Sequence, residues 1–216
     1  WEAIEERVVL ALRLPRVLMA LVSGAGLGLC GAVFQGTFRN PLASPGVLGV
    51  TAGAGFGAAL GILLFGWGIP AQVSAFLFGA LAIAATYTIT RKTHANSLLI
   101  FVLAGVIVNM FFQSLISLVK FTADTEDKLP SIVYWLMGSL SGVSYQTVAI
   151  SIPVIIVSSV FLILLRWRIN VLSLGEETVS ALGINLKTLM VLLLFFTTVN
   201  VSAVVSAAGI VGWIGL

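Results

Sequence analysis

The fold of this chain is decided by one short polar segment and by the apolar runs on either side of it. The segment is Val171–Leu186, VLSLGEETVSALGINL, and the flanking runs are Thr147–Leu165 and Thr188–Ala208. Apolar runs of about 20 residues have the length of a membrane-spanning helix. We therefore expect two spans joined by a connector that presents a small surface outside the membrane.

The connector carries the sequence signals of a short helix. Ser173 can cap a helix N-terminus, Glu176 and Glu177 suit the first turn, and Gly183 can end the helix. Together these residues predict a helix of about two turns, which is too short to cross a bilayer.

The composition extends the membrane interpretation to the whole chain. Of the 216 residues, 59% are hydrophobic and 9% are charged, and the mean hydropathy is +1.14. This balance excludes a soluble domain. The single cysteine, Cys30, excludes a disulfide framework and a thiolate metal site. The formal charge of +3 gives no indication of nucleic-acid binding.

Apolar runs long enough to span the bilayer recur along the chain, and a further one begins near Gly209. The runs are Val17–Phe38, Val47–Gly66, Ala71–Thr90, Leu98–Val119, Thr147–Leu165 and Thr188–Ala208. The sequence therefore predicts an all-α polytopic membrane protein, with residues 1–216 forming a single transmembrane domain. Because the chain begins abruptly at Trp1 and stops inside an apolar run, we expect it to be part of a longer protein.

The connections between the runs predict the orientation. Basic residues mark the cytoplasmic side of a membrane protein. One side collects Arg39, Arg91, Lys92, Arg166, Arg168 and Lys187, whereas the other collects Lys120, Lys128, Asp124, Glu126 and Asp127. The first side is therefore predicted to be cytoplasmic. Arg13 and Arg16 fall on the outer side and break this rule, either as anchors to lipid headgroups or as a positive patch for an acidic partner.

Two connections have a predictable local structure. Arg39–Pro45 reads RNPLASP, and its two prolines exclude a continuous helix. Leu129–Gly142 is expected to form a short interfacial helix, with Tyr134 and Trp135 at the level of the lipid headgroups.

Small residues at helical spacing predict close packing. Gly53, Gly57 and Gly61 repeat every four residues, as do Gly24 and Gly28. Such stripes let the backbones of two helices approach closely, and packing is their ordinary role.

Polar residues at the same spacing leave two interpretations open. Asn109, Gln113 and Ser117 form a line along one face of the fourth run. Polar groups at bilayer depth face other helices or a water-filled cavity. The line is therefore interpreted either as interhelical hydrogen bonding or as the lining of a translocation path.

The chain lacks residues and motifs that several classes of function require. No Asp or Glu occurs in any predicted span, and the one histidine, His94, falls in a predicted cytoplasmic loop. This argues strongly against proton coupling and less strongly against sodium coupling. The chain also lacks HExxH, GxSxG and P-loop motifs, which argues against an intramembrane enzyme and against nucleotide binding.

These stretches together resemble the permease family of bacterial ATP-binding-cassette (ABC) importers for iron-siderophores, haem, cobalamin and related chelates. The similarity covers nearly the whole chain and is most specific where NPLASPG and LGEE…LG occur together. The matching stretches are RLPR at Arg13–Arg16, GLCGAVFQGTFRNPLASPGVLGVTAGAGFGA at Gly28–Ala58, LPSIVYWLMGSLSG at Leu129–Gly142, LGEETVSALGINL at Leu174–Leu186 and AAGIVGWIGL at Ala207–Leu216.

The resemblance implies a fragment with about six to seven of the roughly ten spans of a type II importer permease. It implies a multi-pass protein of the bacterial or archaeal inner membrane, without catalytic residues, metal ligands or a bound cofactor. ATP and Mg would bind a partner ATPase. The implied partners are a second permease copy, two ATPase subunits, an extracytoplasmic substrate-binding protein and the lipid bilayer, and no nucleic acid.

The resemblance also implies roles for individual residues. A coupling helix at about residues 174–183 would dock on the ATPase through Leu174, Gly175, Glu176, Glu177, Val179, Ala181, Leu182 and Gly183. Arg13 and Arg16 would receive the binding protein, and Asn40, Pro41, Pro45 and Gly46 would form a structural loop. The expected substrate is a metal chelate, and the alternatives are a small oxyanion such as molybdate or, for an ion-coupled secondary transporter, an unspecified solute.

Overall fold

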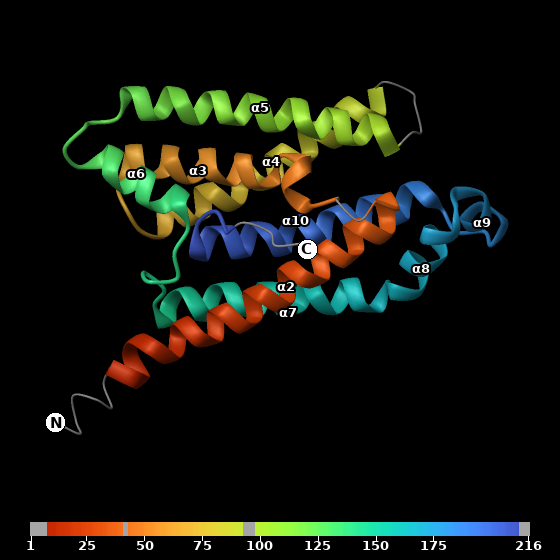
Figure 1. Ribbon diagram of the computed structural model, residues 1–216, viewed down its shortest axis with the longest axis horizontal. Helices are drawn as coiled ribbons and strands as arrows, with labels where there is room; N and C mark the ends of the chain where they lie inside the picture. Colours follow the sequence, from red (N-terminus) through yellow and green to blue (C-terminus); the bar gives the residue numbers. More distant parts are fainter. Residues whose placement is uncertain (1–7, 41–42, 93–97, 212–216) are drawn as a thin grey trace.

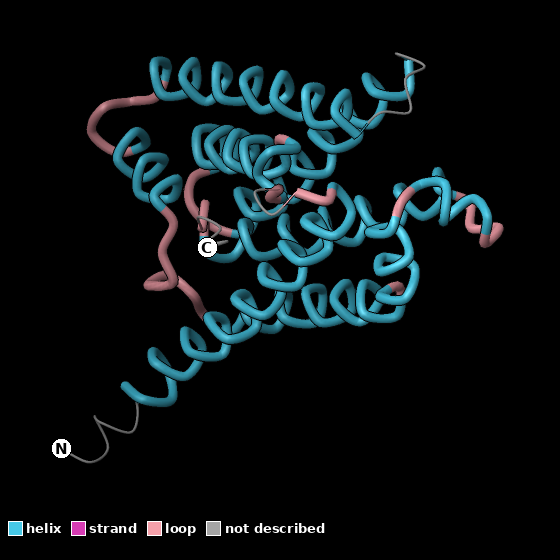
Figure 2. The backbone as a smooth tube through the Cα atoms, turned by 45° about the vertical axis from the view of Figure 1, so that its right-hand side comes forward, coloured by secondary structure: helices cyan, strands magenta, loops and turns pink. Residues whose placement is uncertain are grey.

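The computed structural model describes residues 8–40, 43–92 and 98–211, and this part of the chain is helical apart from short connections (Figures 1 and 2). No β-strand occurs in the described ranges. The elements are η1 (Val9–Arg13, a π-helical turn), α2 (Leu14–Phe38), η2 (Pro45–Leu48, a 3₁₀ turn), α3 (Val50–Phe65), α4 (Ile69–Lys92), α5 (Leu98–Thr122), α6 (Lys128–Met137), α7 (Tyr145–Leu164), α8 (Arg166–Leu174), α9 (Glu176–Ala181) and α10 (Leu186–Ala208). The predicted all-α membrane bundle is confirmed.

Helix α10 lies at the centre of the bundle, in contact with α2, α3, α4 and α7 (Figure 1). Its most apolar stretch is 61% buried, compared with 22% for α4 and 28% for α7. Helix α5 lies at the edge, where it packs on α3 and α4. The main apolar core therefore runs along α10 and α3, through residues such as Val50, Ala54, Leu193 and Val201.

Among the described residues, five helices are long and apolar enough to cross a membrane, which confirms five of the six predicted spans. The expected span Val47–Gly66 is shorter than predicted, because α3 has only 16 residues. Residues Pro45–Leu48 form η2 instead, and Gly49 and Gly66, with φ of 82° and 81°, bound α3. At 1.5 Å per residue α3 is about 24 Å long, less than the hydrocarbon thickness of about 30 Å.

The glycine stripe of α3 packs against α4, as predicted. A Cβ atom at Gly53 would lie 2.6 Å from Ala82 Cβ, and one at Gly61 would lie 2.7 Å from Ala71 Cα. The prediction is not met at Gly24 and Gly28, because a Cβ there would have no atom of the described chain within 4 Å. Helix α2 turns that face away from α7 and α10.

The first helix starts earlier than expected. The first run was expected to begin at Val17, with Arg13 and Arg16 outside it, but η1 and α2 form one apolar helix over Val9–Phe38. Pro15 lies at the junction of η1 and α2, where the hydrogen bonding changes from π-helical to α-helical. Both arginines therefore project from helix, not from a turn.

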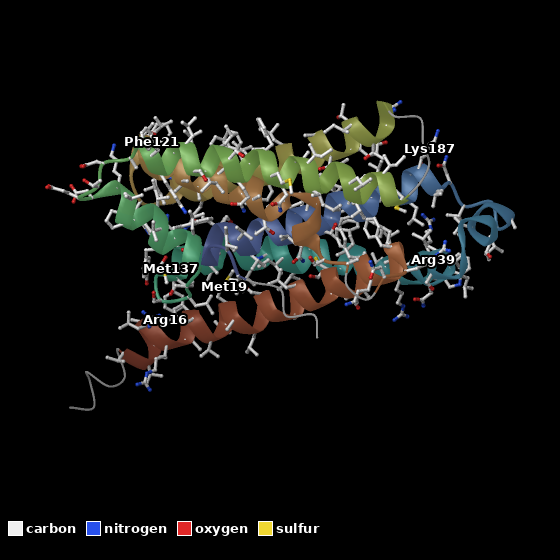
Figure 3. All side chains as sticks on the ribbon, turned by 45° about the horizontal axis from the view of Figure 1, so that its top comes forward. Arg16, Met19, Arg39, Phe121, Met137 and Lys187 are labelled. Atoms are coloured by element: carbon white, nitrogen blue, oxygen red, sulfur yellow. The ribbon has the colours of Figure 1, made fainter. Side chains whose placement is uncertain are left out.

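The connecting segments gather at two opposite ends of the bundle. Helix α6 lies at one end, and α8 and α9 lie at the other (Figure 1). Arg39 and Lys187 lie near α8 and α9, whereas Arg16, Phe121 and Met137 lie near α6 (Figure 3). We call the end with α8 and α9 the inner end, because it is the side predicted to be cytoplasmic. We call the end with α6 the outer end.

Candidate functional site

The inner end carries the short helix predicted from the sequence. Helix α8 ends at Leu174, Gly175 takes a φ of 137°, and α9 covers Glu176–Ala181. Gly183, with a φ of 71°, lets the Ile184 N–H donate back to the Val179 carbonyl at 3.1 Å. This closes the helix in the glycine-dependent manner expected from the sequence.

The expected N-cap is wrong. The hydroxyl of Ser173 donates to the Asn170 carbonyl at 2.7 Å, so this side chain belongs to the last turn of α8. A hydroxyl in a helical turn can bond the carbonyl three residues earlier, and here that bond competes with capping of the next helix. The backbone turn at Gly175 separates α8 from α9 instead.

The connector has a buried side and an exposed side. Val179 has 0% of its surface exposed, whereas Leu174 is 73% and Leu182 is 55% exposed. Placing Val179 on the outer surface of α9 was therefore incorrect, because this side chain packs inward among residues such as Leu172. Ala181 and Gly183 are exposed, and the side chains of Glu176 and Glu177 lie outside what the structure describes.

Exposed cations lie at the inner end. Arg39, Arg91, Arg166, Arg168 and Lys187 are exposed, and Arg39 and Lys187 can be seen close to α8 and α9 (Figure 3). The side chain of Lys92 and the whole of His94 lie outside the described residues. An apolar edge set among cations suits a protein surface with acidic and apolar groups.

At the outer end, α6 is the interfacial helix expected within Leu129–Gly142. Its aromatic residues differ from the prediction, because Trp135 is buried at 7% exposure and only Tyr134 is exposed. Trp135 packs with Ile132 in the main core. Consecutive residues of a helix point about 100° apart, so only one of the two can face the headgroups.

The loop after α6 is tied to the bundle by polar contacts. The Ser139 N–H donates to the Ala208 carbonyl at 2.7 Å, and the Ser139 and Ser141 hydroxyls are 2.8 Å apart. Tyr134 Oη lies 2.5 Å from Ser141 Oγ. Hydrogen bonds from Ser141 and then Ser139 lower the pKa of Tyr134, and the positive charge of Arg16 contributes in the same direction.

The two outer arginines have different surroundings. Arg16 is half-buried, and its Nη2 donates to the Ser141 carbonyl at 2.6 Å. Arg13 is exposed in the last turn of η1. Arg16 therefore holds the loop after α6 in place, while Arg13 carries an exposed charge.

The loop between α2 and α3 interrupts the helix, as its prolines predicted. Arg39 takes a left-handed φ of 47°, and the Ala43 N–H donates to the Asn40 carbonyl at 3.0 Å. Pro45 begins η2, in which the Gly49 N–H donates to the Gly46 carbonyl at 3.2 Å. Pro41 lies outside the described residues.

The polar line on α5 has one member that fits the packing interpretation, and for Gln113 and Ser117 the translocation path stays a prediction. Asn109 Nδ2 donates to the Gly46 carbonyl at 3.1 Å, so this residue packs α5 against the α2–α3 loop. Gln113 and Ser117 are exposed on the same helix, and the Ser117 hydroxyl bonds only the Gln113 carbonyl within the described chain. Interhelical bonding therefore accounts for Asn109 alone.

Sequence reasoning missed a buried polar cluster around Asn200. This side chain has no exposed surface, and its amide reaches the hydroxyls of Ser158 and Ser159 on α7. An asparagine in the middle of a predicted span is itself a signal, because polar groups are costly at bilayer depth. No cluster of metal-ligating side chains occurs among the described residues.

The described residues line a small cavity at the outer end. It has a volume of about 30 Å³ and lies between Trp67, Gln72, Tyr134 and Ser206. This volume is room for about one water molecule. A solute of the size of a metal chelate does not fit in it.

Comparison with known proteins finds the same architecture over the whole chain. A solved structure described as an inward-facing conformation of a putative metal-chelate type ABC transporter matches with a TM-score of 0.92 and 39% identity, over 99% of this chain and 68% of that one. The molybdate import system permease protein MolB of Haemophilus influenzae is 40% identical over 100% of this chain and 64% of its own length.

A probable iron chelatin transport system permease protein of Helicobacter pylori is also 40% identical, over 97% of this chain and 63% of its own length. The chain thus spans less than two thirds of these curated relatives. The likeness, together with five helices able to cross a membrane, places it in the inner membrane as a multi-pass protein. The sequence model of the FecCD transport family matches residues 1–216, and the chain belongs to that family.

Proposed function

We propose that this chain is the main part of a permease subunit of an ATP-driven importer, acting as one transmembrane domain over residues 1–216. The permease itself performs no chemistry and binds no cofactor. ATP and Mg bind a separate ATPase, and a rigid-body movement of that ATPase is passed to the spans. Two permease copies and two ATPase subunits make up the membrane complex, and an extracytoplasmic protein delivers the solute.

The observation that carries this proposal is the exposed edge of the α8–α9 connector. Leu174 and Leu182 are exposed on a connector whose inward side is packed at Val179. Glycines with positive φ bound α9 at Gly175 and Gly183. An apolar edge of this kind outside the membrane calls for a protein partner, and an ATPase is the partner that would drive uptake.

At the outer end, the proposed partner is the solute-binding protein. Arg13 supplies an exposed cation, and Arg16 keeps the adjacent loop in shape through the Ser141 carbonyl. An acidic face on the binding protein would pair with Arg13.

The solute is proposed to pass along a surface of the chain rather than through it. The 30 Å³ cavity is too small for a chelate, while Gln113 and Ser117 expose polar groups along α5. A second copy placed against this surface would enclose a path between the two. A metal chelate and molybdate both stay candidates, because relatives named for each are 40% identical to this chain.

The test uses the full-length permease assembled with its ATPase and binding protein in proteoliposomes. Leu182→Asp is expected to uncouple ATP hydrolysis from uptake, because the new negative charge would be buried against the ATPase. Gln146→Glu is the control, since it adds the same charge at an exposed position in the first turn of α7, at the outer end and away from the connector. Uptake is measured with radiolabelled molybdate and with a labelled iron chelate in parallel.

Two results would contradict the proposal. Normal ATP-driven uptake by Leu182→Asp would remove α9 as the coupling surface. Uptake by the permease without any ATPase, driven by an ion gradient, would instead establish a secondary transporter.

A further inference from the structure

The polar cluster around Asn200 links α10 to α7 in the interior of the bundle. The Nδ2 atom of Asn200 lies 2.9 Å from Ser159 Oγ, 3.0 Å from Ser158 Oγ and 3.2 Å from the Ile155 carbonyl oxygen. These three acceptors lie within about one turn of α7. Separating the helices here would leave the amide without partners in an apolar interior, which is costly.

The same asparagine also meets α2. Its Oδ1 is buried without a hydrogen-bond partner among the described residues. A Cβ atom at Gly26 would lie 2.6 Å from this oxygen and 2.9 Å from Ile155 Cγ2. Gly26 is therefore the residue that allows α2, α7 and α10 to meet at one point.

A second contact joins α7 and α10 closer to the inner end. The rings of Phe161 and Phe196 are stacked, with centroids 4.5 Å apart and planes at 9°. Because α7 and α10 are the two spans on either side of the connector, a movement imposed on α9 is passed to this pair, and it is also passed to α2, which α8 contacts. The aromatic stack lies at one level of the pair, and the amide cluster lies about one turn deeper.

We propose that Asn200 is a positioning residue that makes α7 and α10 respond as one body when α9 is moved. If the bonds from Asn200 to α7 were absent, α7 and α10 would slide past each other. The movement of α9 would then be lost before it reached the centre of the membrane. This inference rests on the proposed function, because it requires a partner that moves α9.

The experiment compares two substitutions in the full-length permease–ATPase complex in proteoliposomes. Asn200→Leu keeps the approximate volume and removes the amide. Thr197→Val is the control, because Thr197 is equally buried and its hydroxyl bonds only the Leu193 and Leu194 carbonyls of its own helix. Asn200→Leu should lower the solute transported per ATP hydrolysed by about five-fold or more, the lower range of ordinary coupling energies. Thr197→Val should leave this ratio unchanged.

A distance measurement gives a readout that a loss of stability alone would not move. Spin labels at the exposed residues Leu164 and Val191, in a Cys30→Ala background, report the separation of α7 and α10 at the inner end. This distance should be the same with and without ATP in the wild type, and it should change with ATP in Asn200→Leu. If Asn200→Leu does not assemble, Ser158→Ala with Ser159→Ala removes two of the acceptors and should give the same result.

A wild-type transport ratio in Asn200→Leu, or a wild-type α7–α10 distance that itself changes with ATP, would overturn the inference. Failure of the proposed function would look different, since the wild-type complex would then show no ATP-dependent uptake at all.

Discussion

The connector at the outer end and the connector at the inner end are held in different ways. Helix α6 and its following loop are fastened to three other helices, through Arg16 on α2, the Leu63 carbonyl of α3 and the Ala208 carbonyl of α10. Lys128 Nζ donates to the Leu63 carbonyl at 2.8 Å, and the other two bonds are 2.6 and 2.7 Å long. Helix α9, in contrast, packs mainly on α8 and leaves Leu182 exposed.

This difference separates two kinds of surface. A connector whose polar groups are bonded to the bundle keeps its shape without a partner and suits the docking of a protein that arrives and leaves. A connector with an exposed apolar edge and few contacts gains its remaining burial from a partner that stays. The outer end therefore suits transient docking, and the inner end suits a permanent subunit.

The largest expected effect comes from removing the anchor of the outer connector. Trp135→Ala should lower the free energy of unfolding by about 3–5 kcal/mol, because it empties a buried aromatic site. Thermal unfolding of the full-length permease in detergent measures this loss. Met137→Ala, at a position that is 75% exposed on the same helix, is the control. Equal effects of the two substitutions would show that α6 is not anchored by Trp135.

A smaller effect is expected at the inner connector, where substitutions on the buried side and on the exposed side should change different properties. Val179→Ala should destabilise the permease alone by about 1–3 kcal/mol, through lost apolar burial and a new cavity. Leu182→Ala should leave the unfolding temperature of the permease unchanged and weaken its association with the ATPase. Binding of purified ATPase to the solubilised permease measures the second effect. A Leu182→Ala variant that unfolds early but binds normally would reverse this assignment.

Substitutions of the two outer arginines should have effects of different kinds. Arg16→Gln should cost about 1 kcal/mol and raise hydrogen exchange of the Ser139–Gly142 amides, because a partly exposed charged hydrogen bond is lost. Arg13→Gln should leave exchange unchanged and weaken docking of the binding protein, in a salt-sensitive way. If Arg13→Gln also raises exchange in the loop, the division of roles between the two arginines is incorrect.

The smallest expected effect concerns the face of α5 that runs between the two ends. In a Cys30→Ala background, Gln113→Cys should react with a water-soluble thiol reagent in at least one nucleotide state, with stability unchanged. Asn109→Cys should react more slowly, because that position packs on the Gly46 loop. An active Gln113→Cys variant that stays unlabelled in every state would assign this face to lipid or to helix packing.

Much of the architecture followed from local signals in the sequence. Runs of apolar residues identified five spans, two prolines identified the break after α2, and Gly183 identified the end of α9. The spacing of Gly53, Gly57 and Gly61 predicted a close helix contact, and the structure shows that α4 is the partner. Each of these depends on length, backbone conformation or a missing side chain, which are properties that a few neighbouring residues determine.

The tertiary structure alone decided which side chains face inward. In a membrane helix both faces are apolar, so the hydrophobic pattern does not distinguish the packed face from the lipid face. For this reason the burial of Trp135 was not predicted. The burial of Val179 and the partner of Arg16 depend on contacts with distant parts of the chain, which local sequence does not show. The contact of Asn200 with α7 and Gly26 joins residues more than 40 positions apart in sequence, and only the folded arrangement of three helices brings them together.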